Sequence, residues 1–181
     1  FILFEYNTAS KQGLVNLTTA IQNKVIEQTK IPAFISIDQE GGMVVKAFNG
    51  PTFFPGNMAL SATNNPNNSY LVGKAMGEEL RNYGINMNFA PVLDVNNNPL
   101  NPIIGVRSYS DNPEKVAQFG VNMVKGLKES HVIATAKHFP GHGDTSVDTH
   151  FGLPEIPHDL DRLNKVELFP FKKAIQENID A

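Results

Sequence analysis

Short runs of apolar residues alternate with longer amphipathic stretches along the whole chain. The apolar runs cover residues 1–4, 33–37, 85–92 and 132–136, and each has the length of a buried strand. Between them, apolar side chains recur three and four positions apart, which is the spacing of one helix face. This repeated order of strand and helix predicts parallel strands with helices packed outside them.

The amphipathic stretches predict four helices. The first begins after Ser10, whose side chain can cap it, and the second covers residues 69–83. The third begins at Pro113, because proline is favoured at the first position of a helix. The last runs from Asp159 towards the end of the chain, and we expect Pro170 to interrupt it.

Polar segments rich in glycine, proline or asparagine follow the strands at residues 38–42, 94–102 and 137–150. In a (β/α)8 barrel such segments gather at the carboxyl ends of the strands, where active sites lie. The segment after the first strand has no glycines, which argues against a dinucleotide-binding fold. We therefore expect an α/β fold, a partial (β/α)8 TIM barrel of about four βα units.

With 181 residues, the chain fits one domain or most of a larger one. It begins with a strand and ends within a helical pattern, so we expect residues 1–181 to be part of a single barrel that is truncated at both ends. The net charge of −3 gives no reason to expect nucleic acid or an anionic membrane as a partner. Cysteine is absent, and no apolar stretch reaches the ~20 residues that span a bilayer.

The most informative segment is residues 137–150, where Pro140, Gly141 and Gly143 prevent a regular helix. In an extended segment Asp148 and His150 point the same way, so the carboxylate can orient the imidazole and favour its protonated form. That pairing suits a general acid/base near neutral pH. The alternative is a surface loop with two polar residues.

The same segment contains the ligand types of a metal site. The possible ligands are His138, His142, Asp144, Asp148 and His150. A helical zinc pair is disfavoured, because the glycines and the proline break the helix that it needs.

Four polar residues that lie at strand ends or in loops are candidate ligand contacts. Lys137 and His138 end a buried strand, and the lysine could bind a polar ligand or form an ion pair that closes the mouth of the barrel. Asp38 could bind sugar hydroxyls, act as a nucleophile or cap a turn. Arg107 is either a ligand contact or a solvated side chain.

Taken together, these segments resemble the family 3 glycoside hydrolases, in particular the bacterial β-N-acetylglucosaminidase branch of the NagZ type. The similar segments follow the family's order and cover essentially the whole chain. They are Ile37-Asp38-Gln39-Glu40-Gly41-Gly42, residues 88–95, Gly105-Val106-Arg107-Ser108-Tyr109, Lys137-His138-Phe139-Pro140-Gly141-His142-Gly143-Asp144-Thr145, and Asp148-Thr149-His150. One departure is Met43, where relatives often carry arginine.

The resemblance implies a barrel that removes terminal β-linked N-acetylglucosamine from cell-wall fragments with retention of configuration. It implies that His150 is the acid/base and that Asp148 orients it. The ring hydroxyls of the sugar would be held by Asp38, Arg107, Lys137 and His138. No metal or organic cofactor is expected, and the expected partner is a small oligosaccharide or muropeptide.

Retaining chemistry also needs a carboxylate nucleophile, which the resemblance places on a loop beyond Ala181. We therefore expect the 181-residue chain to be inactive alone. Two other functions on the same fold stay open: a phosphorylase, because a neutral imidazole would not repel phosphate, and a carbohydrate-binding relative. A metal-dependent hydrolase is a further alternative. The natural substrate and the compartment, whether secreted, cell-wall-associated or cytoplasmic, also stay open.

Overall fold

Four short strands form a parallel sheet in the order β1-β2-β5-β6. In the computed structural model these are Ile2–Leu3, Ser36–Ile37, Met87–Asn88 and Ile133–Ala134. Ile2 pairs with Ser36, Ser36 with Met87, and Met87 with Ile133, so the strands are in register across the sheet. The structure describes residues 1–46, 52–146, 152 and 155–181.

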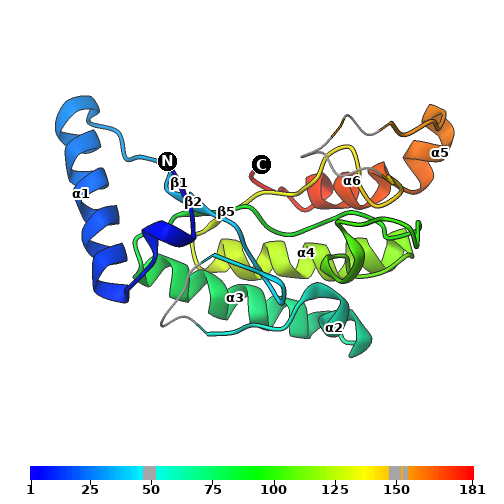
Figure 1. Ribbon diagram of the computed structural model, residues 1–181, viewed down its shortest axis with the longest axis horizontal. Coiled ribbons are helices and arrows are strands. Elements are labelled where there is room, and N and C mark those ends of the chain that lie inside the picture. Colours follow the sequence, from blue (N-terminus) through cyan, green and yellow to red (C-terminus); the bar gives the residue numbers. More distant parts are fainter. Residues whose placement is uncertain (47–51, 147–151, 153–154) are drawn as a thin grey trace.

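Along the chain, one or more helices follow each strand of the parallel sheet. The α-helices are α1 (Lys11–Thr29), α2 (Asn57–Ala62), α3 (Pro66–Asn82), α4 (Pro113–Glu129), α5 (Leu160–Lys165) and α6 (Leu168–Gln176). Two 3-10 turns, η1 (Glu5–Asn7) and η2 (Gly105–Arg107), and an antiparallel hairpin of β3 (Gln39–Gly41) and β4 (Val44–Val45) complete the described elements. In Figure 1, α3, α4 and α6 lie side by side, and α1 stands at the other end of the molecule. The predicted α/β class is confirmed, and the arrangement is that of part of a (β/α)8 barrel.

The hydrophobic core lies between the sheet and the helices. Ile35, Ile37 and Ile85 come from the strands or their approaches and are fully buried. Phe119 and Leu127 of α4 belong to the same core cluster. Burying such side chains contributes about 2 kcal/mol each, which holds the strand ends at fixed positions.

The helix starts have local causes. The Ser10 hydroxyl accepts a hydrogen bond from the Gly13 amide, as its capping role predicts. The Asn112 side chain caps α4, which begins at Pro113 as predicted. The second predicted helix begins earlier than residue 69, because Asn65 caps it and Pro66 takes the first position.

The expected interruption at Pro170 is wrong. Pro170 lies in the first turn of α6, where a missing amide hydrogen costs no helical hydrogen bond. The break falls instead between α5 and α6, around Val166 and Glu167. Among the described helices, none combines the length and the apolar character that crossing a bilayer requires.

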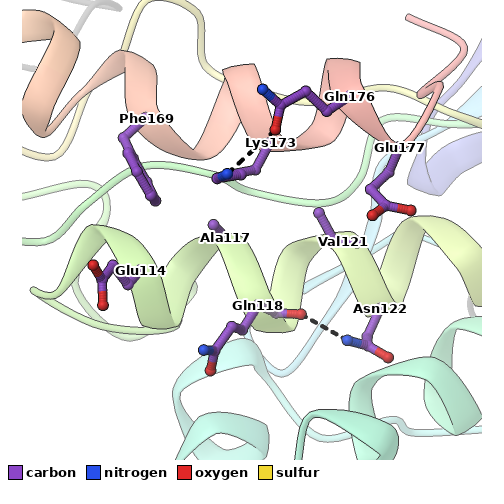
Figure 2. A pocket seen from close by; sticks show the side chains of 9 residues that line it. All are labelled: Glu114, Ala117, Gln118, Val121, Asn122, Phe169, Lys173, Gln176 and Glu177. Atoms are coloured by element: carbon purple, nitrogen blue, oxygen red, sulfur yellow. Dashed lines mark hydrogen bonds between the residues drawn. The ribbon is translucent and has the colours of Figure 1, made fainter.

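The outer surface has a groove of about 520 Å³ between α4 and α6. Figure 2 shows Ala117 and Val121 of α4 facing Phe169 and Lys173 of α6 across it. None of the described residues that line it belongs to the loops that follow the strands, so its described lining is separate from the strand-end site.

Candidate active site

Three neighbouring strands deliver polar side chains to one edge of the sheet. Asp38 follows β2 directly, and Asp94 lies in the segment after β5. Lys137 follows β6, and its backbone forms a parallel bridge with Val92. Because carboxyl ends of parallel strands meet at one face, these three side chains converge.

Lys137 lies between two carboxylates. Its ammonium nitrogen is 2.5 Å from Oδ1 of Asp38 and 2.7 Å from Oε1 of Glu40. The Lys137 side chain is 14% exposed, and the Glu40 side chain is 2% exposed. A lysine this buried needs paired anions, and both carboxylates supply them.

Arg107 binds Glu40 from the other side in a two-point contact. Nε lies 3.0 Å from Oε2, and Nη2 lies 2.8 Å from Oε1. The planar guanidinium matches the carboxylate in this geometry. The Asn57 side chain donates to the Arg107 carbonyl at 2.7 Å, which ties η2 to α2. Arg107 is therefore an anchored residue of the site and not a solvated loop arginine.

The two cations determine the charge state of Glu40. Burial by itself raises the pKa of this carboxyl, but the hydrogen bonds and charges of Arg107 and Lys137 outweigh burial and leave the pKa below its ordinary value. Burial likewise acts to lower the pKa of Arg107, and the hydrogen bond and charge of Glu40 leave it raised. Both groups are thus charged at neutral pH.

His138 is held by the buried carboxylate of Asp94. Its Nδ1 is 2.6 Å from Oδ2 of Asp94, while Oδ1 accepts hydrogen bonds from the amides of His138 and His142 at 3.2 and 2.7 Å. On the other side of the ring, Nε2 lies 3.2 Å from Nη2 of Arg107. Since arginine only donates, Nε2 acts as the acceptor and Nδ1 carries the proton.

The loop after β6, which contains Gly141 and Gly143, is fixed to the loop after β5. The side-chain amide of Asn101 donates to the carbonyls of His142 and Thr145 at 2.7 and 2.9 Å. A Cβ on Gly143 would lie 1.8 Å from the carbonyl oxygen of Val95, so only glycine fits there. The predicted absence of a helix over this loop is confirmed for its described residues.

A second polar cluster lies where this loop meets the last helices. Nε2 of His158 is 2.5 Å from Oδ2 of Asp144, and Nη1 of Arg162 is 2.7 Å from Oε1 of Glu167. Asp144, His158 and Glu167 bring possible metal-ligand atoms within 4.8 Å of one another. The guanidinium of Arg162 also contacts Asp144 at 3.5 Å and supplies the positive charge that this cluster needs.

This cluster differs from the predicted metal-ligand set. Of the members of that set that the structure describes, only Asp144 belongs to it, because the rings of His138 and His142 are bound by Asp94 and by the Thr145 hydroxyl respectively. Asp148 and His150, the expected acid/base pair, lie outside the described residues.

The structure brings together the four predicted sugar-binding residues that it describes. Asp38, Lys137, Arg107 and His138 form one connected network with Glu40 and Asp94. Glu40 and Asp94 were not among the predicted site residues. A signal for them was present in the sequence, because each follows a buried strand and a carboxylate buried at such a position needs a charged or hydrogen-bonding partner.

Comparison with known proteins gives one family. The chain matches the model described as "Glycosyl hydrolase family 3 N terminal domain" over residues 1–181. It is 44% identical to beta-hexosaminidase A of Pseudoalteromonas piscicida, over 97% of this chain and 30% of that protein. It is 34% identical to beta-hexosaminidase of Stenotrophomonas maltophilia strain K279a, over 99% of this chain and 54% of that protein. The chain thus spans about a third to a half of these relatives.

Solved structures agree. A family 3 β-N-acetylglucosaminidase from Paenibacillus sp. str. FPU-7 superposes with a TM-score of 0.96 at 49% identity, covering 99% of this chain and 34% of that one. NagZ from Neisseria gonorrhoeae, solved with N-trifluoroacetyl-D-glucosamine, gives a TM-score of 0.90 at 33% identity, over 98% and 53%. The resemblance noted in the sequence motifs is confirmed, and the chain belongs to glycosyl hydrolase family 3.

Proposed function

We propose that the protein carrying this chain is a retaining glycoside hydrolase that removes terminal β-linked N-acetylglucosamine from oligosaccharides, peptidoglycan fragments among them. The observation that carries the proposal is the network of Asp38, Lys137, Arg107 and His138 at the strand ends. It presents charged donors and acceptors with fixed geometry, which suits recognition of several hydroxyl groups on one ring. The names of the similar proteins, β-hexosaminidase and β-N-acetylglucosaminidase, support the substrate class.

In the proposed site, Asp38 accepts hydrogen bonds from ring hydroxyls, and Lys137, Arg107 and His138 bind the sugar oxygens. Glu40 and Asp94 act through these residues and need no contact with the sugar. Glu40 balances the charge of both cations, and Asp94 fixes the imidazole. The pocket is organised before substrate arrives, so little binding energy is spent on orienting it.

His150 is proposed as the acid/base and Asp148 as the residue that orients it. In the first step the protonated imidazole gives its proton to the leaving oxygen while a carboxylate attacks the anomeric carbon. In the second step the neutral imidazole takes a proton from water, which attacks the glycosyl-enzyme from the same face, so that the configuration is retained.

The nucleophile is proposed to lie outside residues 1–181, which we take to be part of a single catalytic barrel. The resemblance to the family puts the nucleophile on a later strand-end loop and assigns none of Asp38, Asp94 and Asp144 to that role. The isolated 181-residue chain is therefore expected to be inactive towards chromogenic substrates, whereas the full-length protein is expected to turn them over.

The test is hydrolysis of 4-nitrophenyl N-acetyl-β-glucosaminide by the full-length protein beside its His150→Ala variant. We expect kcat/KM to fall by about 10²–10⁴ in the variant, the usual contribution of an acid/base. The first step should recover with a better leaving group such as 2,4-dinitrophenol. An inactive parent, or a variant with unchanged kcat/KM for both leaving groups, would exclude the proposal.

A further inference from the structure

A hydrogen bond between Asp144 and His158 joins two parts of the chain that lie on either side of the proposed acid/base. Oδ2 of Asp144 is 2.5 Å from Nε2 of His158. In the sequence, Asp144 precedes and His158 follows the stretch that contains Asp148 and His150. The proposed sugar-binding network uses neither Asp144 nor His158, so their contact needs a separate explanation.

The contact does not require a charged imidazole. A carboxylate only accepts hydrogen bonds, so Nε2 of His158 carries the hydrogen and donates it to Asp144. That hydrogen is present in the protonated ring and in one of the two neutral tautomers. Both side chains are half-buried, so water competes for the contact less than it does for an exposed pair.

Asp144 is held in place by the loop that follows β5. The side-chain amide of Asn98 donates to the carbonyl of Asp144 at 3.3 Å, and that of Asn101 donates to the carbonyl of Thr145 at 2.9 Å. The same loop begins at Asp94, the carboxylate that fixes the ring of the sugar-site histidine. The backbone at Asp144 is therefore tied to the frame of the sugar site.

His158 is tied to a different element, helix α5. The next residue, Asp159, caps this helix by accepting a hydrogen bond from the Arg162 amide at 2.8 Å. The guanidinium of Arg162 reaches both carboxylate oxygens of Glu167 at 2.7 Å, and its contact with Asp144 is longer, at 3.5 Å. Among the described residues, the imidazole is therefore the close partner of the Asp144 carboxylate.

A contact between these two elements limits the conformations of the chain between them, because joining both ends of a segment removes conformational entropy. An acid/base must also lie within hydrogen-bond reach of the oxygen that it protonates. Resting on the proposed function, we propose that Asp144 and His158 are positioning residues: their hydrogen bond joins the two ends of the segment that carries Asp148 and His150 and so places the acid/base, while neither touches the substrate.

The test uses two substrates that differ in their need for an acid. Phenyl N-acetyl-β-glucosaminide releases a poor leaving group that must be protonated, whereas the 2,4-dinitrophenyl glycoside releases a stable anion. The full-length His158→Phe variant keeps a ring but has no donor. We expect its kcat/KM for the phenyl glycoside to fall about 10²-fold, the scale of a misplacement by ~1 Å, and its kcat/KM for the dinitrophenyl glycoside to stay close to that of the parent.

His158→Gln tests whether the hydrogen bond itself is responsible, because the glutamine amide can replace Nε2 as the donor to Asp144. This variant should regain most of the parent's kcat/KM for the phenyl glycoside. Asp144→Ala breaks the same contact from the other side and should reproduce the selective loss, even if His158→Phe did not fold. Equal losses on both glycosides in folded variants, or a His158→Gln protein as slow as His158→Phe on the phenyl glycoside, would overturn the inference.

His131→Phe is the matched control for the substitution. His131 is exposed and directly precedes the residues that lead into β6, so it lies at the opposite edge of the sheet from the strand-end loops. Its kcat/KM should equal that of the parent for both glycosides. A selective loss in this control as large as that of His158→Phe would also overturn the inference.

Hydrogen exchange measures the effect of the contact without relying on activity. The backbone amides of residues 145–157 should exchange faster in full-length His158→Phe than in His131→Phe, and equal exchange would contradict the positioning role. A parent that hydrolyses neither glycoside removes the proposed function, and with it the acid/base that the contact would place. A parent that hydrolyses both, with equal losses in His158→Phe, removes the positioning role alone.

Discussion

The buried carboxylate of Asp94 fixes the imidazole of His138, with Oδ2 of Asp94 2.6 Å from Nδ1 of His138. The same carboxylate accepts from the amides of His138 and His142, and its side chain has no exposed surface. One side chain therefore sets both the path of the backbone at the start of the loop and the orientation of the ring. The ring's other nitrogen is left to accept from Arg107.

Replacing Asp94 with asparagine tests this relationship. The amide of asparagine would place a donor against the Nδ1 proton of His138, which favours the other tautomer and breaks the contact between Nε2 and Arg107. We expect kcat/KM of the full-length protein to fall about 10²-fold, the scale of one lost orienting interaction in a preorganised site. The measurement is steady-state hydrolysis of 4-nitrophenyl N-acetyl-β-glucosaminide.

Asp111→Asn is the control for that variant, since Asp111 is exposed and, among the residues that the structure describes, its side chain accepts one hydrogen bond, from the Ser110 hydroxyl. It should keep the parent's kcat/KM and stability. If Asp94→Asn kept the parent's activity as well, the Asp94–His138 contact would have no part in orienting the ring for substrate.

Glu40 predicts a pH dependence of stability. Because its pKa in the folded protein is lower than the ordinary value of 4.5, the unfolded chain takes up a proton first as pH falls. Its contribution to stability is therefore complete above about pH 4.5 and is lost as the pH falls further, towards the folded pKa. The free energy of unfolding, measured by denaturant titration from pH 6 to pH 3, should decrease over that window.

The variant Glu40→Gln isolates this contribution. At pH 7 it leaves Lys137 and Arg107 without their shared anion, which is expected to cost about 3 kcal/mol. The gap in unfolding free energy between parent and variant should narrow as the pH falls below 4.5. A gap that stayed constant from pH 6 to pH 3 would mean that the pKa of Glu40 is not lowered by folding.

The contacts around Glu40 also explain how much of the site could be predicted. Asp38, Lys137 and His138 follow buried strands, so periodicity alone places them at one edge of the sheet. The partner of Arg107 could not be predicted in this way, because Glu40 lies 67 residues away and only the folded chain brings the two together. Local patterns locate a site, whereas long-range packing decides which charges meet.

The helices and strands also differ in whether local sequence patterns or long-range packing determine them. Caps at Ser10 and Asn112 are local, so the helix starts that depend on them were predicted. Helix α2 and the β3–β4 hairpin lie between the second predicted strand and the second predicted helix, in residues 38–68, for which the sequence predicted no helix or strand. The hairpin is stabilised partly from outside, since the Gly42 amide donates to the carbonyl of Phe54 at 2.9 Å. Residues that depend on such distant partners carry little local signal.

The cluster around Glu167 makes a prediction about stability alone. The Glu167 side chain is 3% exposed, and Arg162, which is 35% exposed, contacts both of its carboxylate oxygens at 2.7 Å. Arg162→Met keeps the length of the side chain and removes its charge, which leaves Glu167 buried without a cation. We expect a loss of about 2 kcal/mol, between the costs of breaking buried and exposed ion pairs.

Thermal unfolding of the Arg162→Met protein at neutral pH measures that loss. Lys165→Met serves as the control, because Lys165 lies exposed on the same helix and its loss leaves the Glu167 pair intact. The two variants should differ clearly in melting temperature. Equal melting temperatures would show that the Arg162–Glu167 pair contributes no net stability.

Gly143 makes the last prediction, because its backbone lies against the backbone of Val95 with no room for a side chain. A Cβ at this position would fall 1.8 Å from the Val95 carbonyl oxygen, so Gly143→Ala forces two loops of the site apart. We expect a loss of about 3 kcal/mol in unfolding free energy, at the upper end of overpacking costs. Gly105→Ala separates this effect from backbone strain, since Gly105 has a φ of +43° but no described residue has an atom within 4 Å of an added Cβ. That control should lose about 1 kcal/mol, and a Gly143→Ala protein no less stable than the control would refute the close contact between the two loops.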